Sequence, residues 1–231
     1  SAQRRAVSRS ARAPSDAPAP AVDGNALLSF VDGITPQQRD DVLFSVQLAL
    51  RGASGAFDRF AQTEAWYKKY TEILERLGWT SEQFAFARHD QQEGELRMDQ
   101  AALALIAAIA TQNQLAVLNE AIQALETLAE DDKTLRLFDF HTSTQASGNF
   151  QLGAVQTTNN GALSLALGAF HFKSHDARRR VLFVKWGAQQ LEFWTAAQRL
   201  TLNTTQYATL RDAVERKLGL EAQDFIADLP L

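Results

Sequence analysis

The fold of this chain is decided between residues 149 and 173, which read NFQLGAVQTTNNGALSLALGAFHFK. Apolar and polar residues alternate over residues 150–154, which is typical of a strand with one buried face. An Asn-Asn-Gly sequence then interrupts two apolar runs, and these residues tolerate the positive φ angles that tight hairpins require. The stretch therefore predicts two antiparallel strands, Asn149–Thr157 and Ala162–Lys173, joined by a short turn.

The alternation in the second of these strands changes phase at Gly168. Three leucines precede the change and two phenylalanines follow it on the opposite parity: Leu163, Leu165, Leu167, Phe170 and Phe172. A β-bulge at Gly168 would place both sets on one face. A second irregularity is expected near Ala196–Ala197, where the apolar spacing changes again.

Three further strands are expected around this hairpin, and they are Leu135–Ser143, Arg179–Gly187 and Leu191–Asn203. Val181–Val184 is apolar on both parities, so that strand is placed centrally. Short connections between consecutive strands favour a meander of neighbours.

The chain on either side of the strands has helical spacing of apolar residues. The expected helices are one from Thr35-Pro36 to Gly52, one over Ala56–Leu77, a short one starting at Trp79, two over Ala101–Ala110 and Leu115–Leu128, and a last one from Thr204 or Thr205 to Gly219. The predicted fold class is α+β, with a helical N-terminal portion packed with an antiparallel sheet of about five strands, then a C-terminal helix. Residues 26–231 are predicted to form a single domain: a helical part at 26–132, a β part at 134–203, the C-terminal helix at 204–219 and an apolar tail at 220–231.

Bulk properties exclude several classes of function. The chain has no cysteine, so it offers no disulfide and no thiolate ligand or nucleophile. Its net charge of -4 argues against specific nucleic-acid binding. The longest near-continuous apolar run, Ala101–Ala110, is half the ~20 residues that span a bilayer, so no transmembrane segment is expected.

The two ends of the chain are candidate interaction segments. Residues 1–25 are predicted to be a disordered, Pro-rich basic arm that carries Arg4, Arg5, Arg9 and Arg12. The arm has no apolar core of a Sec signal peptide, although its composition resembles a transit peptide, and the expected location is cytoplasmic or released. Phe225 and Ile226 lie in the apolar tail, which is expected to dock on its own domain or on a partner.

Catalytic chemistry is weakly represented, and the sequence predicts no catalytic residue and no cofactor. Asp139 and His141 would share one face of a strand, and His171 lies on a strand that would approach them. These three residues could form a two-histidine, one-carboxylate metal site. The alternative is that they lie on the solvated polar face of the sheet and bind no metal. No HExxH, GxGxxG, Walker or GxSxG spacing is present.

Two tryptophans are the best candidates for exposed, partner-facing aromatics. Trp66 lies outside the main apolar stripe of its predicted helix. Trp194 would lie on the same face of its strand as Glu192, opposite the face that carries Phe193. For each of them a core position is the competing interpretation.

Three hypotheses about function follow. The first is a non-enzymatic interaction protein that assembles into homo-oligomers, because there is no catalytic constellation and both chain ends are suited to docking. The second is a secreted membrane-active, pore-forming toxin or virulence factor. Its inserting segment would be the 149–173 hairpin, which is rich in small residues and has little charge. The third is a metal-dependent enzyme or binder that uses Asp139, His141 and His171. Expected partners are therefore a second copy of the chain and, in the second hypothesis, a membrane surface.

Overall fold

The computed structural model describes residues 18–81, 85–90, 94–143, 147–174 and 180–228, and for residues 220–228 it describes the path of the chain alone. Its centre is a seven-stranded mixed sheet in the order β1-β2-β6-β7-β9-β3, with β4 also paired to β9. The strands are β1 (Ala21–Asp23), β2 (Ala26–Phe30), β3 (Trp79–Ser81), β4 (Ala87–Arg88), β6 (Ser147–Thr157), β7 (Leu163–Ser174) and β9 (Leu191–Leu202). β2 and β6 are parallel, and the other neighbouring strands of this sheet are antiparallel. A small second sheet pairs β5 (Glu95–Leu96) with β8 (Trp186–Gly187).

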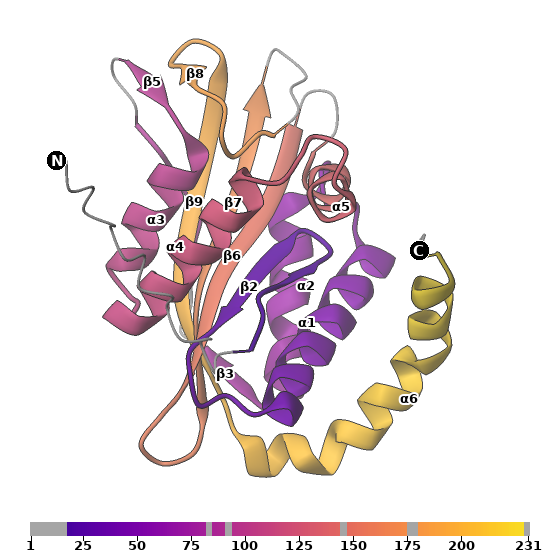
Figure 1. Cartoon of the computed structure of the whole chain (residues 1–231). Coiled ribbons are helices and arrows are strands. Elements are labelled where there is room, and N and C mark those ends of the chain that lie inside the picture. Colours follow the sequence, from indigo (N-terminus) through magenta and orange to yellow (C-terminus); the bar gives the residue numbers. More distant parts are fainter. Residues whose placement is uncertain (1–17, 82–84, 91–93, 144–146, 175–179, 229–231) are drawn as a thin grey trace, which may run out of the picture.

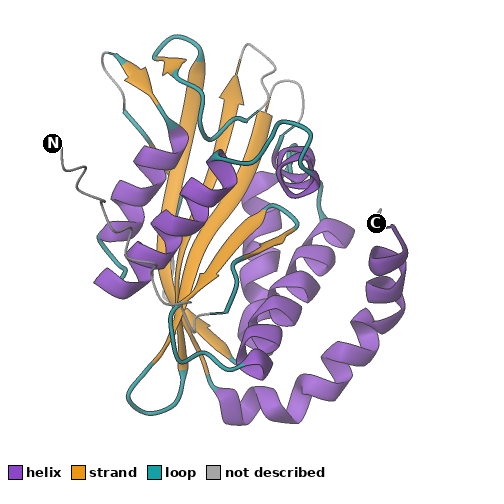
Figure 2. Ribbon diagram, in the orientation of Figure 1, coloured by secondary structure: helices purple, strands orange, loops and turns teal. Residues whose placement is uncertain are grey.

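Helices cover both faces of the large sheet, so the molecule has three layers (Figure 1). One layer contains α1 (Pro36–Ala56) and α2 (Thr63–Arg76), with α6 (Thr204–Asp228) packed against α1. The other contains α3 (Met98–Ala107), α4 (Gln112–Glu126) and α5 (Lys133–Thr142). Figure 2 shows the long strands running between the two helical layers.

The helices begin where the sequence supplies capping residues. Thr35 and Gln38 form a capping box at the start of α1, and Thr111 and Gln114 form a second one at the start of α4. In each box the threonine hydroxyl accepts a hydrogen bond from a free N–H of the first turn, and the glutamine side chain accepts one from the N–H of the threonine. These caps fix where α1 and α4 begin.

Two apolar cores lie on opposite faces of the sheet. Leu163, Leu165 and Leu167 of β7 face α1 and α2, whereas Phe170 and Phe172 of the same strand face α3, α4 and α5. Because both faces are buried, both parities of the central strand are apolar.

The structure confirms the predicted α+β class, with its helical N-terminal portion and C-terminal helix. It also confirms the 149–173 hairpin, whose strands pair without interruption from Ser147 with Lys173 to Thr157 with Leu163. The C-terminal helix continues beyond the predicted end at Gly219, to Asp228.

No bulge occurs at Gly168, contrary to the sequence-based prediction. Gly168 pairs in register with Leu152 on one side and Ala197 on the other, and the register through Ala196–Ala197 is also continuous. The glycine is needed for close packing instead. A Cβ there would come within 2.6 Å of the Phe170 ring and 2.8 Å of the Ile106 Cδ1 atom.

The predicted strand Leu135–Ser143 is wrong, because these residues belong to helix α5. The Asp132 side chain accepts a hydrogen bond from the Thr134 N–H at 2.9 Å, which caps the helix. Leu135 and Phe138 are three apart and both are buried, so the apolar spacing that matters here is helical.

The predicted strand Arg179–Gly187 is also wrong for most of its length. Val181 and Leu182 are buried in a turn on the α3–α5 side of the sheet, and only Trp186–Gly187 is strand. An apolar run can be buried by a loop as well as by a central strand. Trp79–Ser81, predicted to start a short helix, is strand β3.

The N-terminal strands were not predicted. Ala21–Asp23 forms β1, so the last part of the predicted arm belongs to the sheet, while residues 1–17 lie outside the described residues. Within the described part of the chain, no helix combines the length and the apolar character needed to cross a bilayer.

Candidate functional site

The three longest strands form the most unusual feature of the molecule. β6, β7 and β9 contain 11, 12 and 12 residues. At about 3.3 Å per residue each strand is about 36–40 Å long, which exceeds the ~30 Å hydrocarbon core of a bilayer. Between Asp139 and Lys173 the sequence contains no Asp, Glu, Lys or Arg. The β6–β7 hairpin is therefore a long antiparallel pair that is almost free of charge.

The folded protein covers this hairpin on both faces. β6 turns Phe150, Leu152 and Ala154 toward α3–α5 and the polar Asn149 and Gln151 toward α1–α2. β7 is apolar on both faces, so the hairpin as a whole does not have one apolar and one polar face. Its low charge is required by burial in this state, and one helical layer must separate from the sheet before the hairpin can meet lipid.

Few polar contacts join the α3–α4 layer to the hairpin. The Gln114 Nε2 atom donates to the carbonyl oxygens of Ala154 and Ser164, both at 3.1 Å, and the Thr111 hydroxyl lies 2.7 Å from the Gln156 Oε1 atom. Arg199 of β9 donates to the Ile109 carbonyl from both Nε (3.2 Å) and Nη2 (2.6 Å). The buried contact between this layer and the strands, within the part of the chain that the structure describes, is mainly apolar.

Charged residues gather at one end of the α3–α4 pair. Arg97 makes a bidentate pair with Asp99 at 3.1 and 2.9 Å and a further contact with Glu126 at 2.9 Å. The hydrogen bond from Arg97 to Asp99 raises the pKa of the guanidinium. Arg180, whose φ of 55° is unusual for a side-chain-bearing residue, donates to the carbonyl oxygens of Leu128 and Glu126 at the end of α4.

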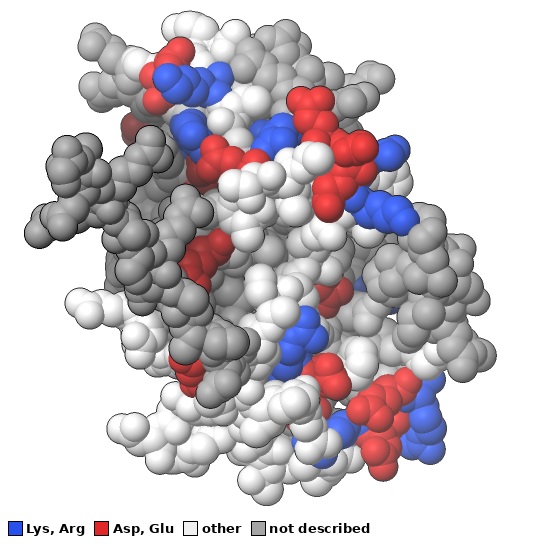
Figure 3. Space-filling view, viewed as in Figure 1, with Lys and Arg blue, Asp and Glu red and all other residues white. Residues whose placement is uncertain are grey.

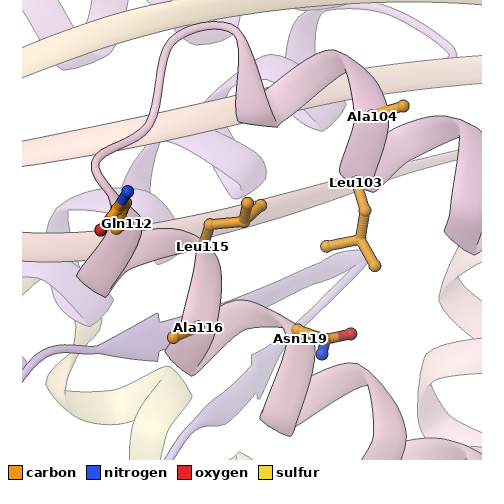
Figure 4. A pocket seen from close by; sticks show the side chains of 6 residues that line it. All are labelled: Leu103, Ala104, Gln112, Leu115, Ala116 and Asn119. Carbon is orange, nitrogen blue, oxygen red and sulfur yellow. The ribbon is translucent and has the colours of Figure 1, made fainter.

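The opposite end of the α3–α4 pair is uncharged. From Gln100 to Asn119, which covers most of both helices and their connection, there is no Asp, Glu, Lys or Arg. A shallow, mostly apolar groove of about 450 Å³ lies between the helices and is shown in Figure 4. Its lining residues are Leu103, Ala104, Gln112, Leu115, Ala116 and Asn119. Figure 3 shows a largely uncharged surface at the lower left, where the β6–β7 turn lies.

A buried polar cluster lies between the sheet and α2. The Asn25 Nδ2 atom donates to Asn149 Oδ1 at 2.8 Å, and the Asn149 Nδ2 atom donates to the Arg59 carbonyl at 3.0 Å. Beside this chain of bonds, Asp23 Oδ2, the Tyr70 hydroxyl and Gln151 Oε1 are buried without a hydrogen-bond partner among the described residues. These polar groups interrupt an otherwise apolar contact.

Asp23 is the titratable group of this cluster. The residue as a whole is half-buried at the edge of the sheet, but its Oδ2 atom is shielded from water. Burial raises the pKa of the Asp23 carboxyl from 3.8 to about 7, and the positive charge of Arg51 opposes part of that rise. The carboxyl therefore changes charge near neutral pH.

The metal-site candidates lie on different elements. Asp139 and His141 are on α5, where residues two apart point in different directions, and His171 is on β7. Asp139 Oδ2 accepts a hydrogen bond from the Arg180 N–H at 3.2 Å, and the His141 carbonyl accepts one from Arg59. Burial, with a contribution from Arg59, lowers the pKa of His141. Among the described residues no group of three His, Cys, Asp or Glu side chains is placed to hold a metal ion.

His171 instead belongs to an aromatic stack. Its ring lies 4.5 Å from that of Trp194 at an interplanar angle of 7°, and Phe86 meets it edge-on at 4.7 Å. Burial, assisted by the charge of Lys173, lowers the pKa of His171 to about 4, so the ring is neutral at pH 7. Trp194 is half-buried in this stack.

Trp66 is not exposed, contrary to the prediction. Its side chain is 0% exposed, stacks on Tyr70 at 5.4 Å and donates from Nε1 to the Ser54 hydroxyl at 3.0 Å. It is a core residue because α2 is covered by α1 on that side. The large apolar side chain that is exposed, among those described, is Phe140 of α5 at 76%. It was missed because 135–143 was interpreted as a strand.

The remaining interaction candidates are at the chain ends. Arg4, Arg5, Arg9 and Arg12 lie outside the described residues. Phe225 and Ile226 fall within α6, whose side chains are described only as far as Gly219.

Comparison with known proteins gives low-level structural overlaps. A delta-endotoxin shares 10% identity over 79% of this chain and 82% of its own, with a TM-score of 0.42. The activated Cyt2Ba monomer from Bacillus thuringiensis subsp. israelensis shares 12% identity over 78% of this chain and 98% of its own, with a TM-score of 0.40. The Evf virulence factor shares 12% over 87% of this chain and 82% of its own, with a TM-score of 0.36.

No protein-family model matches the sequence, and no curated protein matches it. Overlaps at these identities and TM-scores assign no function to the chain.

Proposed function

We propose that this chain is a membrane-active, pore-forming protein of the toxin or virulence-factor class, and that its β6–β7 hairpin enters the bilayer. One observation carries the proposal: two adjacent antiparallel strands, each long enough to span the hydrocarbon core, contain no Asp, Glu, Lys or Arg until Lys173. Burial between two helical layers accounts for the low charge of the strand interiors. The length of the strands and the absence of charge at their ends and in the turn go beyond that requirement, since a soluble sheet tolerates charged residues at strand ends and edges.

Backbone hydrogen bonding makes a hairpin the suitable unit for entry. Inside lipid every N–H and C=O group needs a protein partner, and β6 and β7 supply each other along 11 residue pairs. The outer edges of the hairpin remain to be paired. They are satisfied either by β9 and β2 of the same chain or by hairpins of neighbouring copies, which is how a closed barrel removes its edges. In the second case self-assembly and membrane activity are two parts of one function.

In this proposal the folded state described above keeps the hairpin buried until it enters the bilayer. Both faces of β6 and β7 are covered by helices, so entry requires the α3–α4 layer or the α1–α2 layer to separate from the sheet. The polar contacts between α4 and the hairpin come from Gln114 and Thr111, and the apolar contact is replaced by contact with lipid tails.

A fluorescence experiment tests hairpin entry directly. The chain has no natural cysteine, so Asn159→Cys in the exposed β6–β7 turn can be labelled alone with an environment-sensitive dye. The matched control is Ala208→Cys, which is exposed on α6. With dye-loaded vesicles we expect release of the contents together with a blue-shifted emission from the probe at 159, and no shift from the probe at 208.

Two results would contradict the proposal. Vesicles that keep their contents at every protein concentration and at pH values from 4 to 9 exclude pore formation. Release without any change at position 159 excludes the hairpin as the inserting segment. Light scattering with and without vesicles then reports whether assembly accompanies entry.

A further inference from the structure

We infer that the uncharged end of the molecule, formed by the α3–α4 groove and the β6–β7 turn, is the surface that first binds lipid, and that it binds the interfacial region of a neutral bilayer. This inference rests on the proposed function, because it names the surface through which the hairpin reaches the membrane. It concerns binding before entry, and it can be tested separately from pore formation.

The first step of the inference is the unequal distribution of charge along α3 and α4. Arg97, Asp99, Glu126 and Arg180 lie at one end, whereas residues 100–119 carry no charge. Exposed alanines and half-buried leucines line the outer side of the uncharged part, and they are Ala104, Ala107, Ala108, Ala116, Leu103 and Leu115. A helical pair that serves only as a cover for a sheet places charges on its outer face.

The second step is the position of the β6–β7 turn. Thr111, at the connection between α3 and α4, contacts Gln156 at the end of β6, and Ile109 is contacted by Arg199 of β9. The connection and the turn therefore lie at the same end of the sheet, as Figure 1 also shows. No residue from Thr157 to Gly161 is charged, and all of them are exposed except Thr158, which is half-buried. Binding at this end presents the hairpin tip to the bilayer.

The third step identifies the occupant. The polar side chains of this end are amides and hydroxyls, including Gln112, Asn113, Asn119 and Asn159, and they alternate with alkyl groups. Ester carbonyls and phosphates of a zwitterionic bilayer accept hydrogen bonds from amides, and the adjoining acyl chains take alkyl groups. Two charged residues of opposite sign lie at this end: Arg199 contacts the Ile109 carbonyl, and the exposed Asp32 follows Val31, whose N–H donates to the Val155 carbonyl. Attraction to anionic lipid therefore contributes little, and the net charge of the chain is -4.

The experiment places a charge on this surface without disturbing the core. Ala104→Asp and Ala116→Asp, alone and together, alter exposed positions, and Ala208→Asp is the same change on α6. Binding is measured by flotation with phosphatidylcholine vesicles, with and without phosphatidylserine, at low and high salt. Urea unfolding checks that each variant keeps its stability.

We expect the double variant to bind phosphatidylcholine vesicles at least tenfold more weakly than the unchanged chain, and Ala208→Asp to bind normally. Binding of the unchanged chain should vary less than twofold with salt or with phosphatidylserine. If the double variant binds as tightly as the unchanged chain, or if the unchanged chain binds no vesicle, the inference is wrong. It is also wrong if the substitutions abolish a concentration-dependent dimer in buffer, because the surface then belongs to a second copy.

Dye release separates the two proposals. If the unchanged chain binds through this surface but releases no dye, the lipid site stands and pore formation fails. If the double variant still binds and releases dye like the unchanged chain, pore formation stands and the lipid site fails.

Discussion

Replacing Asp23 with asparagine should change how the stability of the protein depends on pH. The folded-state pKa of this carboxyl is about 7, against 3.8 for an ordinary aspartate. Between those two values the folded chain holds a proton that the unfolded chain has lost, so the free energy of unfolding falls as the pH rises. Below pH 3.8 both states are protonated, and above about pH 7 both are ionised, so the contribution is constant outside that window.

The size of the effect follows from the difference between the two pKa values. Each unit corresponds to 1.36 kcal/mol, which gives about 4 kcal/mol for a fully buried group. Asp23 is half-buried as a residue, and partial access of water reduces this to about 2–4 kcal/mol. The groups that face it are Arg51 of α1, which lowers its pKa, and Tyr70 of α2, which is buried beside it and whose own pKa burial raises far above its ordinary value.

Urea unfolding followed by tryptophan fluorescence provides the measurement. At pH 4 Asp23→Asn and the unchanged chain should have similar stability. At pH 8 the variant should be about 2–4 kcal/mol more stable, because an amide has no charge to bury and can donate to Tyr70 or Gln151. The exposed Asp212→Asn on α6 is the control and should show the same difference from the unchanged chain at both pH values. A constant gap between Asp23→Asn and the unchanged chain from pH 4 to 8 would refute the reasoning.

Three further substitutions test the packing between layers, each by urea unfolding. Arg211→Met leaves the buried Asp41 carboxylate without its bidentate partner at 2.8 Å and should destabilise the protein by about 3 kcal/mol, whereas Lys217→Met on the exposed side of α6 should have little effect. Gln114→Leu leaves the Ala154 and Ser164 carbonyls without this donor and should destabilise by about 1–3 kcal/mol; an equal loss with the exposed Gln123→Leu would show that the two bonds are unimportant. Gly148→Ala places a Cβ 2.4 Å from the Thr142 carbonyl oxygen and should destabilise by about 3 kcal/mol, whereas Gly55→Ala in open space on α1 should stabilise by about 0.5–1 kcal/mol.

Sequence reasoning found the elements whose patterns are local. The β6–β7 hairpin has alternation and a turn signal of its own, and α1 and α4 have threonine caps followed by helical spacing. The fold class followed from these elements. The same reasoning failed for Val181 and Leu182, because apolar residues in a buried loop have the same composition as a central strand. It also failed for α5, since a ten-residue segment is too short for a spacing of 2 to be distinguished from one of 3.6.

The candidate site was less accessible from sequence. The sequence alone shows the low charge of residues 149–173. It does not show that helices distant in the sequence cover both faces of this hairpin. The uncharged end combines Thr111 with Gln156, which are 45 residues apart, and no local pattern brings them together. The polar cluster of Asp23, Tyr70 and Gln151 has no sequence signal at all, because each residue is ordinary in its own segment.

The parallel pairing of β2 with β6 has a consequence for how the chain acquires its structure during synthesis. The Asn25 side chain reaches Asn149 across a sequence separation of 124 residues. At about 5–20 residues per second, a ribosome takes roughly 6–25 seconds to make the intervening chain. During that time β1 and β2 have no sheet to join, and the faces of α1 and α2 that cover the strands stay exposed. Contacts of such long range also slow refolding. The N-terminal third of the protein therefore completes its contacts with the sheet only after the hairpin has been made.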